Sequence, residues 1–113
     1  MKETDIMIFQ ATSSFSDGVA TIDLVGQIDA DSAPTFLDEI KKNMALSPSR
    51  LVLMAKGITF MSSAGLRVLI YARQRLGRAL PIYVVQPQEA LRETLALTGF
   101  DRAVYIVDEA PNS

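Results

Sequence analysis

The sequence predicts a single α/β domain with a mixed, mostly parallel sheet of about five strands and with helices packed on it. Three observations lead to this fold class. Apolar stretches of strand length alternate with amphipathic stretches of helix length, turn-forming residues separate them, and no repeat or linker interrupts the chain. The 113 residues suffice to bury a core without metal or disulfide support. We expect one domain over residues 1–113, with a core of about 6–107 and a fraying tail at 108–113.

The chain should open with two strands, Ile6–Gln10 and Val19–Ile28, on either side of a turn at residues 16–18. Because Ser-Asp-Gly is a turn sequence, we expect these strands to pair antiparallel. A helix should begin next, with Asp31 or Ser32 as its cap and Pro34 in the first turn, where a missing N–H costs nothing. The apolar face of this helix consists of Phe36, Leu37, Ile40 and Met44.

Residues 47–49 (Ser-Pro-Ser) end that helix, and the strand Leu51–Ala55 follows. Its unbroken apolar character predicts a central strand that is covered on both faces. A second helix is predicted over about Ala64–Ala79. We expect its buried side chains to be Leu66, Leu69, Ile70 and Leu76, and its solvated ones to be Arg67, Arg73, Gln74, Arg75 and Arg78.

The C-terminal part adds a strand at Pro81–Val85, a helix at Gln88–Thr98 and a last strand at Ala103–Val107. Leu91 and Leu95 should point inward from this third helix. Gly99 should close it, since glycine readily adopts the left-handed conformation that ends helices. The resulting order is β-β-α-β-α-β-α-β.

The composition excludes several classes of function. The chain has no cysteine and no histidine, and therefore lacks a thiolate nucleophile and the commonest general base and metal ligand. A net charge of −2 gives no broad attraction to nucleic acid or to an anionic membrane. No apolar run approaches the roughly 20 residues of a membrane span. We expect a soluble cytoplasmic protein that binds other proteins, is not an enzyme and inserts in no membrane. We also expect no cofactor and no metal. Asp29 and Asp31 could suggest a magnesium site, but helix capping accounts for them more simply.

The junction between the central strand and the second helix is the predicted functional site. Ser62 and Ser63 enter the helix beside unpaired backbone N–H groups and the positive end of the helix dipole, where a phosphate is electrostatically favourable. The alternative is that one of them simply caps the helix. Since the carboxyl ends of parallel strands share one edge of the sheet, the turns after Ile28 and after Phe60 should be neighbours, and Asp29 should lie close to Ser63.

These residues also carry a resemblance. The segment Leu51–Leu69 resembles the STAS domain of bacterial anti-sigma factor antagonists through Gly57, Phe60, Ser63, Gly65 and Leu66, together with the upstream stretch Gly26–Asp29. In that family, the serine after an aspartate in Asp-Ser-Ser-Gly-Leu or Asp-Ser-Thr-Gly-Leu is phosphorylated by a serine kinase that is also the anti-sigma factor. A phosphatase resets the cycle. The resemblance implies that Ser63 is the phosphorylated residue and that Asp29 is the family's acidic residue near it.

The chain departs from the family pattern at three positions. Ser62 stands where the phosphorylated members have aspartate, Met54 stands where many members have another aspartate, and Ala64 replaces a hydroxyl residue. Ser62 and Ser63 are therefore competing acceptors, and position favours Ser63.

Three classes of function follow. The first is a partner-switching antagonist that binds a serine kinase/anti-sigma factor and is reset by a serine phosphatase. The second is a non-phosphorylated STAS scaffold subunit of a transporter or other signalling complex, and the third is a nucleotide-binding protein or enzyme, for which a glycine-rich phosphate loop is missing. For the first class, we expect the partner-binding surface to consist of Asp29, Thr59, Met61, Ser62, Ala64, Gly65, Leu66 and Arg67.

Overall fold

The computed structural model describes residues 8–111. Within this range the elements are, in order, β1 (Gln10–Ser16), β2 (Val19–Ile28), α1 (Ala33–Met44), β3 (Arg50–Met61), α2 (Ser63–Leu76), β4 (Ile82–Val85), α3 (Glu89–Thr98), the 3-10 turn η2 (Phe100–Arg102) and β5 (Tyr105–Val107). The predicted order of strands and helices is confirmed, and η2 is an addition.

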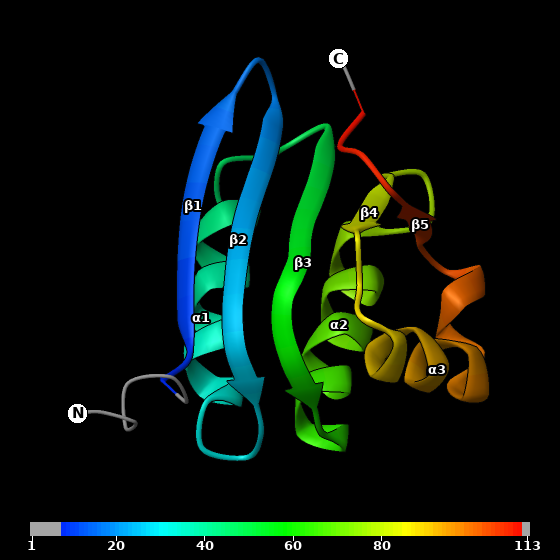
Figure 1. The fold of residues 1–113 in the computed structure, drawn as a ribbon. Coiled ribbons are helices and arrows are strands. Elements are labelled where there is room, and N and C mark those ends of the chain that lie inside the picture. The colour runs from blue at the N-terminus through cyan, green and yellow to red at the C-terminus, as the bar shows by residue number, and fades with distance from the viewer. Residues whose placement is uncertain (1–7, 112–113) are drawn as a thin grey trace.

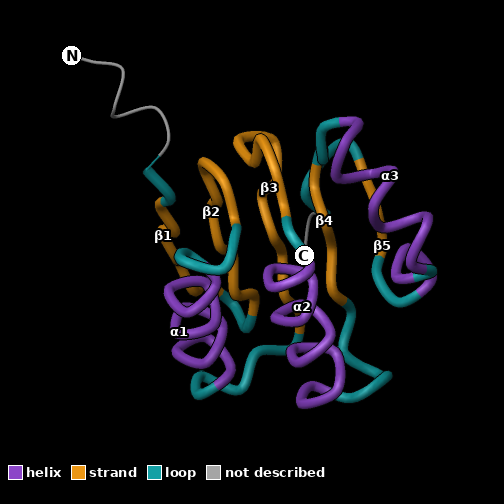
Figure 2. Tube along the Cα trace, turned by 90° about the horizontal axis from the view of Figure 1, so that it is seen from below, coloured by secondary structure: helices purple, strands orange, loops and turns teal. Residues whose placement is uncertain are grey.

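The described strands form one five-stranded sheet in the order β1-β2-β3-β4-β5. β1 and β2 are antiparallel, whereas the pairs β2–β3, β3–β4 and β4–β5 are parallel. The mixed, mostly parallel sheet is therefore confirmed, with β3 in its centre. α1 and α2 lie side by side along one face, and α3 lies near β4 and β5 (Figures 1 and 2).

One hydrophobic core joins the three α-helices of the described chain to the sheet. Phe36 of α1, Leu69 of α2 and Leu95 of α3 are all buried in it, against strand side chains such as Leu53. The predicted apolar positions of α1 hold, since Phe36 and Ile40 are fully buried and Leu37 and Met44 pack partly against the core. On the opposite face of β3, Val52 is also buried and Met54 is half-buried, so the central strand is covered on both faces along most of its first half.

The first strand is later in the chain than predicted. Of the expected strand Ile6–Gln10, residues 6 and 7 lie outside the described residues, and Ile8 and Phe9 precede β1. The strand that pairs with β2 is instead the polar stretch Gln10–Ser16. The turn prediction is confirmed: Asp17 and Gly18 both have positive φ, which suits a two-residue hairpin turn.

β3 is much longer than the predicted Leu51–Ala55. It continues through residues 57–61, paired with β2 across two register shifts. Gly57 permits this close pairing, because a Cβ there would lie 2.9 Å from the carbonyl oxygen of Leu24. The segment from Thr59 to Met61, expected in a loop, is therefore held in the sheet.

α2 also differs from the prediction. It ends at Leu76 instead of Ala79, and its buried face consists of Gly65, Leu66, Val68, Leu69 and Ala72. Ile70 is exposed, because small residues at 65 and 72 shift the face that lies closest to the sheet. Arg73 is not a solvated side chain but donates hydrogen bonds to three backbone carbonyls.

The third helix follows the prediction, with Leu91 and Leu95 buried and Gly99 in the left-handed conformation at its C-terminus. β5 begins at Tyr105 rather than Ala103, since η2 occupies the preceding residues. Of the predicted tail, residues 112–113 lie outside the described residues. No helix within residues 8–111 combines the length and the apolar character that crossing a membrane requires.

Candidate functional site

The two serines at the start of α2 have different surroundings. Ser62 is the N-cap, with extended backbone (φ −84, ψ 177), and its Oγ accepts a hydrogen bond from the Ala64 backbone N–H at 3.2 Å. Ser63 is the first residue of the helix, and its side chain is exposed. Among the hydrogen bonds of the described chain, none involves the Ser63 hydroxyl. Capping thus falls to Ser62, and Ser63 is free to react.

The turns after β2 and β3 are neighbours, as predicted. Ile28 pairs with Met61 at the ends of these parallel strands, and the Ser62 backbone N–H donates to the Ile28 carbonyl oxygen at 2.8 Å. This contact brings the loop that starts at Asp29 beside the N-terminus of α2, at the lower edge of the sheet in Figure 1.

The Asp29 carboxylate organises its own loop. Its Oδ1 accepts hydrogen bonds from the backbone N–H groups of Asp31 and Ser32, both at 3.0 Å. The Ser32 hydroxyl accepts from the Asp29 N–H at 2.9 Å and donates to the Gln27 carbonyl at 2.8 Å. Ser32 occupies the predicted N-cap position of α1, but it makes no side-chain capping bond, since its hydroxyl is engaged with Asp29 and Gln27 instead.

These hydrogen bonds set the electrostatics of Asp29. The N–H of Ser32 is the main cause that holds the pKa of the Asp29 carboxyl below its ordinary value, and partial desolvation opposes the shift. Asp29 is therefore a fixed negative charge at neutral pH, on the loop beside the serines.

The remaining residues of the expected partner surface divide into three groups by burial. Thr59 and Arg67 are exposed, and Ser62 and Ala64 are half-buried. The others, Met61, Gly65 and Leu66, are buried in the core. The exposed part of this surface therefore consists of Thr59, Ser63 and Arg67, with the half-buried Asp29 beside them, and the buried residues hold it in place from below.

Gly65 explains how closely α2 approaches the strands at this point. A Cβ at this position would lie 2.6 Å from Cγ2 of Ile28 and 2.8 Å from Cγ of Met61. Only glycine fits this approach without displacing its neighbours. The serines are thereby fixed relative to the ends of β2 and β3.

Sequence reasoning missed two exposed apolar side chains near the site. Phe60 is 49% exposed and pairs with Gln27, while Val25 on β2 is 44% exposed. Placing residues 57–61 in a strand would have indicated Phe60, because Met61 is buried and adjacent strand residues point to opposite faces of the sheet. Large apolar side chains left in water beside a polar rim are typical of protein-binding surfaces.

With this geometry in place, the comparison with known families is decisive. The STAS domain model matches residues 10–110. The chain belongs to the STAS domain family. The match spans nearly the whole described domain and confirms the family to which the strand–helix junction pointed.

Two similar proteins are anti-sigma factor antagonists. The anti-sigma-F factor antagonist RsfB of Mycobacterium tuberculosis is 28% identical over 86 residues, which are 76% of this STAS chain and 70% of that protein. A crystal structure of an anti-sigma factor antagonist from Mycobacterium paratuberculosis superposes with a TM-score of 0.83 at 28% identity, covering 90% of this chain and 87% of that one.

More distant structures agree in fold. Unphosphorylated SpoIIAA, an anti-sigma factor antagonist, has a TM-score of 0.74 at 16% identity and covers 90% of each chain. The phosphorylated form of this Bacillus protein has a TM-score of 0.68 at 16% identity and covers 90% of this chain and 93% of that one. At 16% identity, this structural similarity shows a shared fold and nothing more.

Proposed function

We propose that this protein is an anti-sigma factor antagonist that switches partners in the cytoplasm through reversible phosphorylation of Ser63. The observation that supports the proposal most strongly is that the two serines at the start of α2 differ. Ser62 caps the helix, and Ser63 presents a free, exposed hydroxyl. The family and the similarity to RsfB support the same role. The protein acts by binding, and its partners are a serine kinase that is also an anti-sigma factor and a serine phosphatase.

Phosphorylation of Ser63 should leave the fold intact. A phosphoserine adds about −1.5 to −2 charges, which the positive end of a helix stabilises by about 0.3–1 kcal/mol. The exposed position of Ser63 lets the phosphate stay hydrated in the free protein. Arg67, one turn into α2, is exposed and adds positive charge to the same end of the helix.

The same phosphate opposes binding of a partner. Burial in an interface would strip its water and remove the solvent that screens it from Asp29, whose low pKa keeps that carboxylate charged. These costs act on the complex and not on the free domain. The switch therefore works through the interface formed by Asp29, Thr59, Ser63 and Arg67 with the neighbouring Phe60.

Mass spectrometry tests the proposal directly. The protein treated with its cognate kinase and ATP should gain one phosphate on Ser63, and Ser63→Ala should abolish it. Ser62→Ala is the matched control and should still be phosphorylated. Phosphate on Ser62 alone, or on neither serine, contradicts the assignment.

The second candidate is a non-phosphorylated STAS scaffold subunit of a transporter or other signalling complex. It is favoured by the residues that replace the aspartates of the phosphorylated members, Ser62 at the cap and Met54 in β3. The two functions differ in a simple measurement. A scaffold should bind its partner equally well as wild type and as Ser63→Asp, whereas the switch requires that Ser63→Asp weaken binding at least about tenfold.

A further inference from the structure

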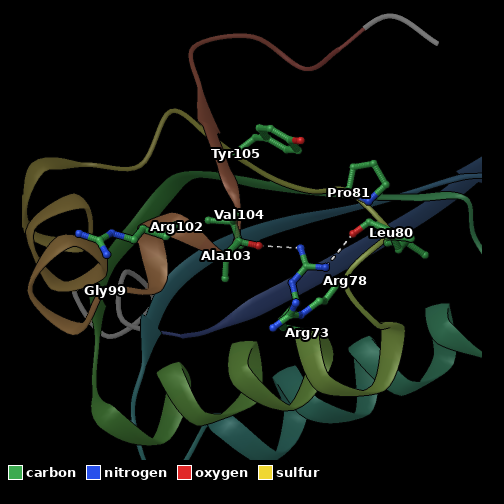
Figure 3. Close-up of a pocket in the computed structure, with 10 residues that line it drawn as sticks. Arg73, Arg78, Leu80, Pro81, Gly99, Arg102, Ala103, Val104 and Tyr105 are labelled. Carbon is green, nitrogen blue, oxygen red and sulfur yellow. Dashed lines mark hydrogen bonds between the residues drawn. The ribbon is translucent and has the colours of Figure 1, made fainter.

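A second candidate site lies at the opposite end of the parallel strands from Ser63. A cavity of about 600 Å³ opens between the C-terminus of α2, the start of β4, and the segment from Gly99 to Tyr105 (Figure 3). The residues that line it include Arg73, Arg78, Arg102, Leu80, Pro81 and Tyr105. A cavity of this volume falls in the range of small-molecule sites.

The charge of the cavity has one sign. Three of the lining residues are arginines, contributed by α2, by the loop after it and by η2, and none is acidic. Within residues 8–111, no carboxylate lies within 4.0 Å of these guanidinium groups, and the salt bridge found there joins Lys42 to Glu39. The three arginines therefore line the cavity without counter-ions from the described chain; Arg73 and Arg78 lie beside each other, whereas the Arg102 side chain points away from them (Figure 3).

Arg73 is already held in place. Its Nη1 donates to the carbonyl oxygen of Gly77 at 2.7 Å. Figure 3 shows the two other bonds, from Nη1 to the Leu80 oxygen at 2.8 Å and from Nη2 to the Ala103 oxygen at 2.7 Å. Its Nε is buried and has no hydrogen-bond partner in the described chain. Burial also lowers the pKa of this guanidinium, as expected for a charge without a counter-ion.

Arg73 has a structural role, since it satisfies carbonyls near the end of α2. That role does not account for Arg78 and Arg102. Both are exposed, and neither makes a hydrogen bond or ion pair within residues 8–111. The exposed Arg78 beside the fixed Arg73, with the aromatic ring of Tyr105 in the wall, is suited to an anion that carries an organic group.

We propose that this cavity binds a small phosphate ester, with the phosphate group on Arg78 beside Arg73 and the organic group against Tyr105 and Pro81. The site is separate from the switch. α2 begins at Ser63 and is 14 residues long, which places its two ends about 20 Å apart. Failure of either proposal therefore leaves the other standing.

NMR titration of the ¹⁵N-labelled chain, at constant ionic strength held with sodium chloride, tests the site with inorganic phosphate, phenyl phosphate and phenol as separate probes. Phenyl phosphate should give saturable shifts at the amides of Arg78, Leu80, Val104 and Tyr105. Inorganic phosphate should shift the same amides more weakly, and phenol should not.

Variants identify the groups responsible. The double variant Arg78→Gln/Arg102→Gln should weaken phenyl phosphate binding at least about tenfold, since the charge-assisted contact of Arg78 and the positive charge of Arg102 at the rim are both lost. The control pair Arg67→Gln/Arg75→Gln removes the same charge from exposed positions of α2 outside the cavity and should leave binding unchanged.

Three results would overturn the proposal. They are the absence of saturable shifts with phenyl phosphate, an equal loss of binding in both double variants, and shifts centred on Ser63 and Gly65. An unchanged spectrum outside the titrated amides verifies that Arg78→Gln/Arg102→Gln still folds.

Discussion

Ser62 and Ser63 are adjacent and chemically identical, yet their surroundings give them different roles. Ser62 uses its oxygen to satisfy the Ala64 N–H, whereas Ser63 points into solvent from the first turn of α2. The sequence predicted that a serine would stand at this helix end, but it left two acceptors open. Only the helix start at residue 63 decides which of them is the cap.

The two serines should therefore differ in their effect on stability. Ser62→Ala removes the cap and should lower the free energy of unfolding by about 0.5–2 kcal/mol. Ser63→Ala should change it by less than about 0.5 kcal/mol, since alanine suits an exposed helical position. Urea denaturation of both variants measures the difference. A larger loss for Ser63→Ala would mean that its hydroxyl is structural and would weaken the phosphorylation proposal.

Asp29 gives a second prediction at this scale. Because folding lowers its pKa, its ionised form contributes stability that is present above its unfolded pKa of about 3.9 and is lost as the pH falls through the lower folded value. Asp29→Asn preserves the shape of the side chain and its acceptor oxygen but removes the charge. The variant should melt below wild type at pH 7, and the two melting temperatures should converge as the pH falls below about 4.

Asp31→Asn is the control for this comparison. It removes an exposed carboxylate from the same loop, and its melting curve should follow wild type at each pH. A gap between Asp29→Asn and wild type that stays constant down to acid pH would show that the ionised carboxylate is not what stabilises the loop.

The elements show where physical reasoning from the sequence succeeds. Helix ends marked by Pro34 and Gly99 were predicted correctly, because these residues have few conformational alternatives. β1 was displaced, since its residues are mostly polar and form an edge strand whose identity depends on pairing with β2. Register shifts let β3 continue to Met61, and no pattern in the local sequence predicts these shifts.

Gly65 tests how tightly α2 and the strand ends fit. Alanine is the better helix former by about 1 kcal/mol, but its Cβ would collide with Ile28 and Met61. The clash should dominate, so Gly65→Ala should lower the free energy of unfolding by about 1–3 kcal/mol in urea denaturation. It should also disturb partner binding, because the serines would move. A stabilised Gly65→Ala variant would show that α2 can move away from Ile28 and Met61 enough to accommodate a methyl group.

Across the whole molecule, the two edge strands of the sheet, β1 and β5, are held to the rest of the domain by different polar contacts. β1 is tied to α1 by a polar cluster in which the buried Asn43 donates to Ser13 Oγ at 2.9 Å and to the Glu39 carbonyl at 2.8 Å. β5 has only three residues and is held at its start by Arg73 through the Ala103 carbonyl. Neither tie could be predicted, because each joins side chains to partners 30 residues away in the sequence.

Arg73 is therefore expected to secure the edge of the sheet that contains β4 and β5. Arg73→Ala leaves the carbonyls of Gly77, Leu80 and Ala103 without their donor. Hydrogen bonds to a charged donor are worth about 1.5–3 kcal/mol each, but exposed carbonyls regain hydrogen bonds to water. The variant should therefore lower the free energy of unfolding by about 2–4 kcal/mol. Arg73→Lys should fall between Arg73→Ala and wild type, because one ammonium cannot span the three acceptors. Arg67→Ala, an exposed change on the same helix, should be nearly neutral.

Hydrogen exchange locates the effect of Arg73 in the sheet. The amides of β5 and η2 should exchange faster in Arg73→Ala, while those of β2 and β3 should open only with global unfolding. Uniform acceleration across the sheet would mean that Arg73 supports the whole core and not this edge alone.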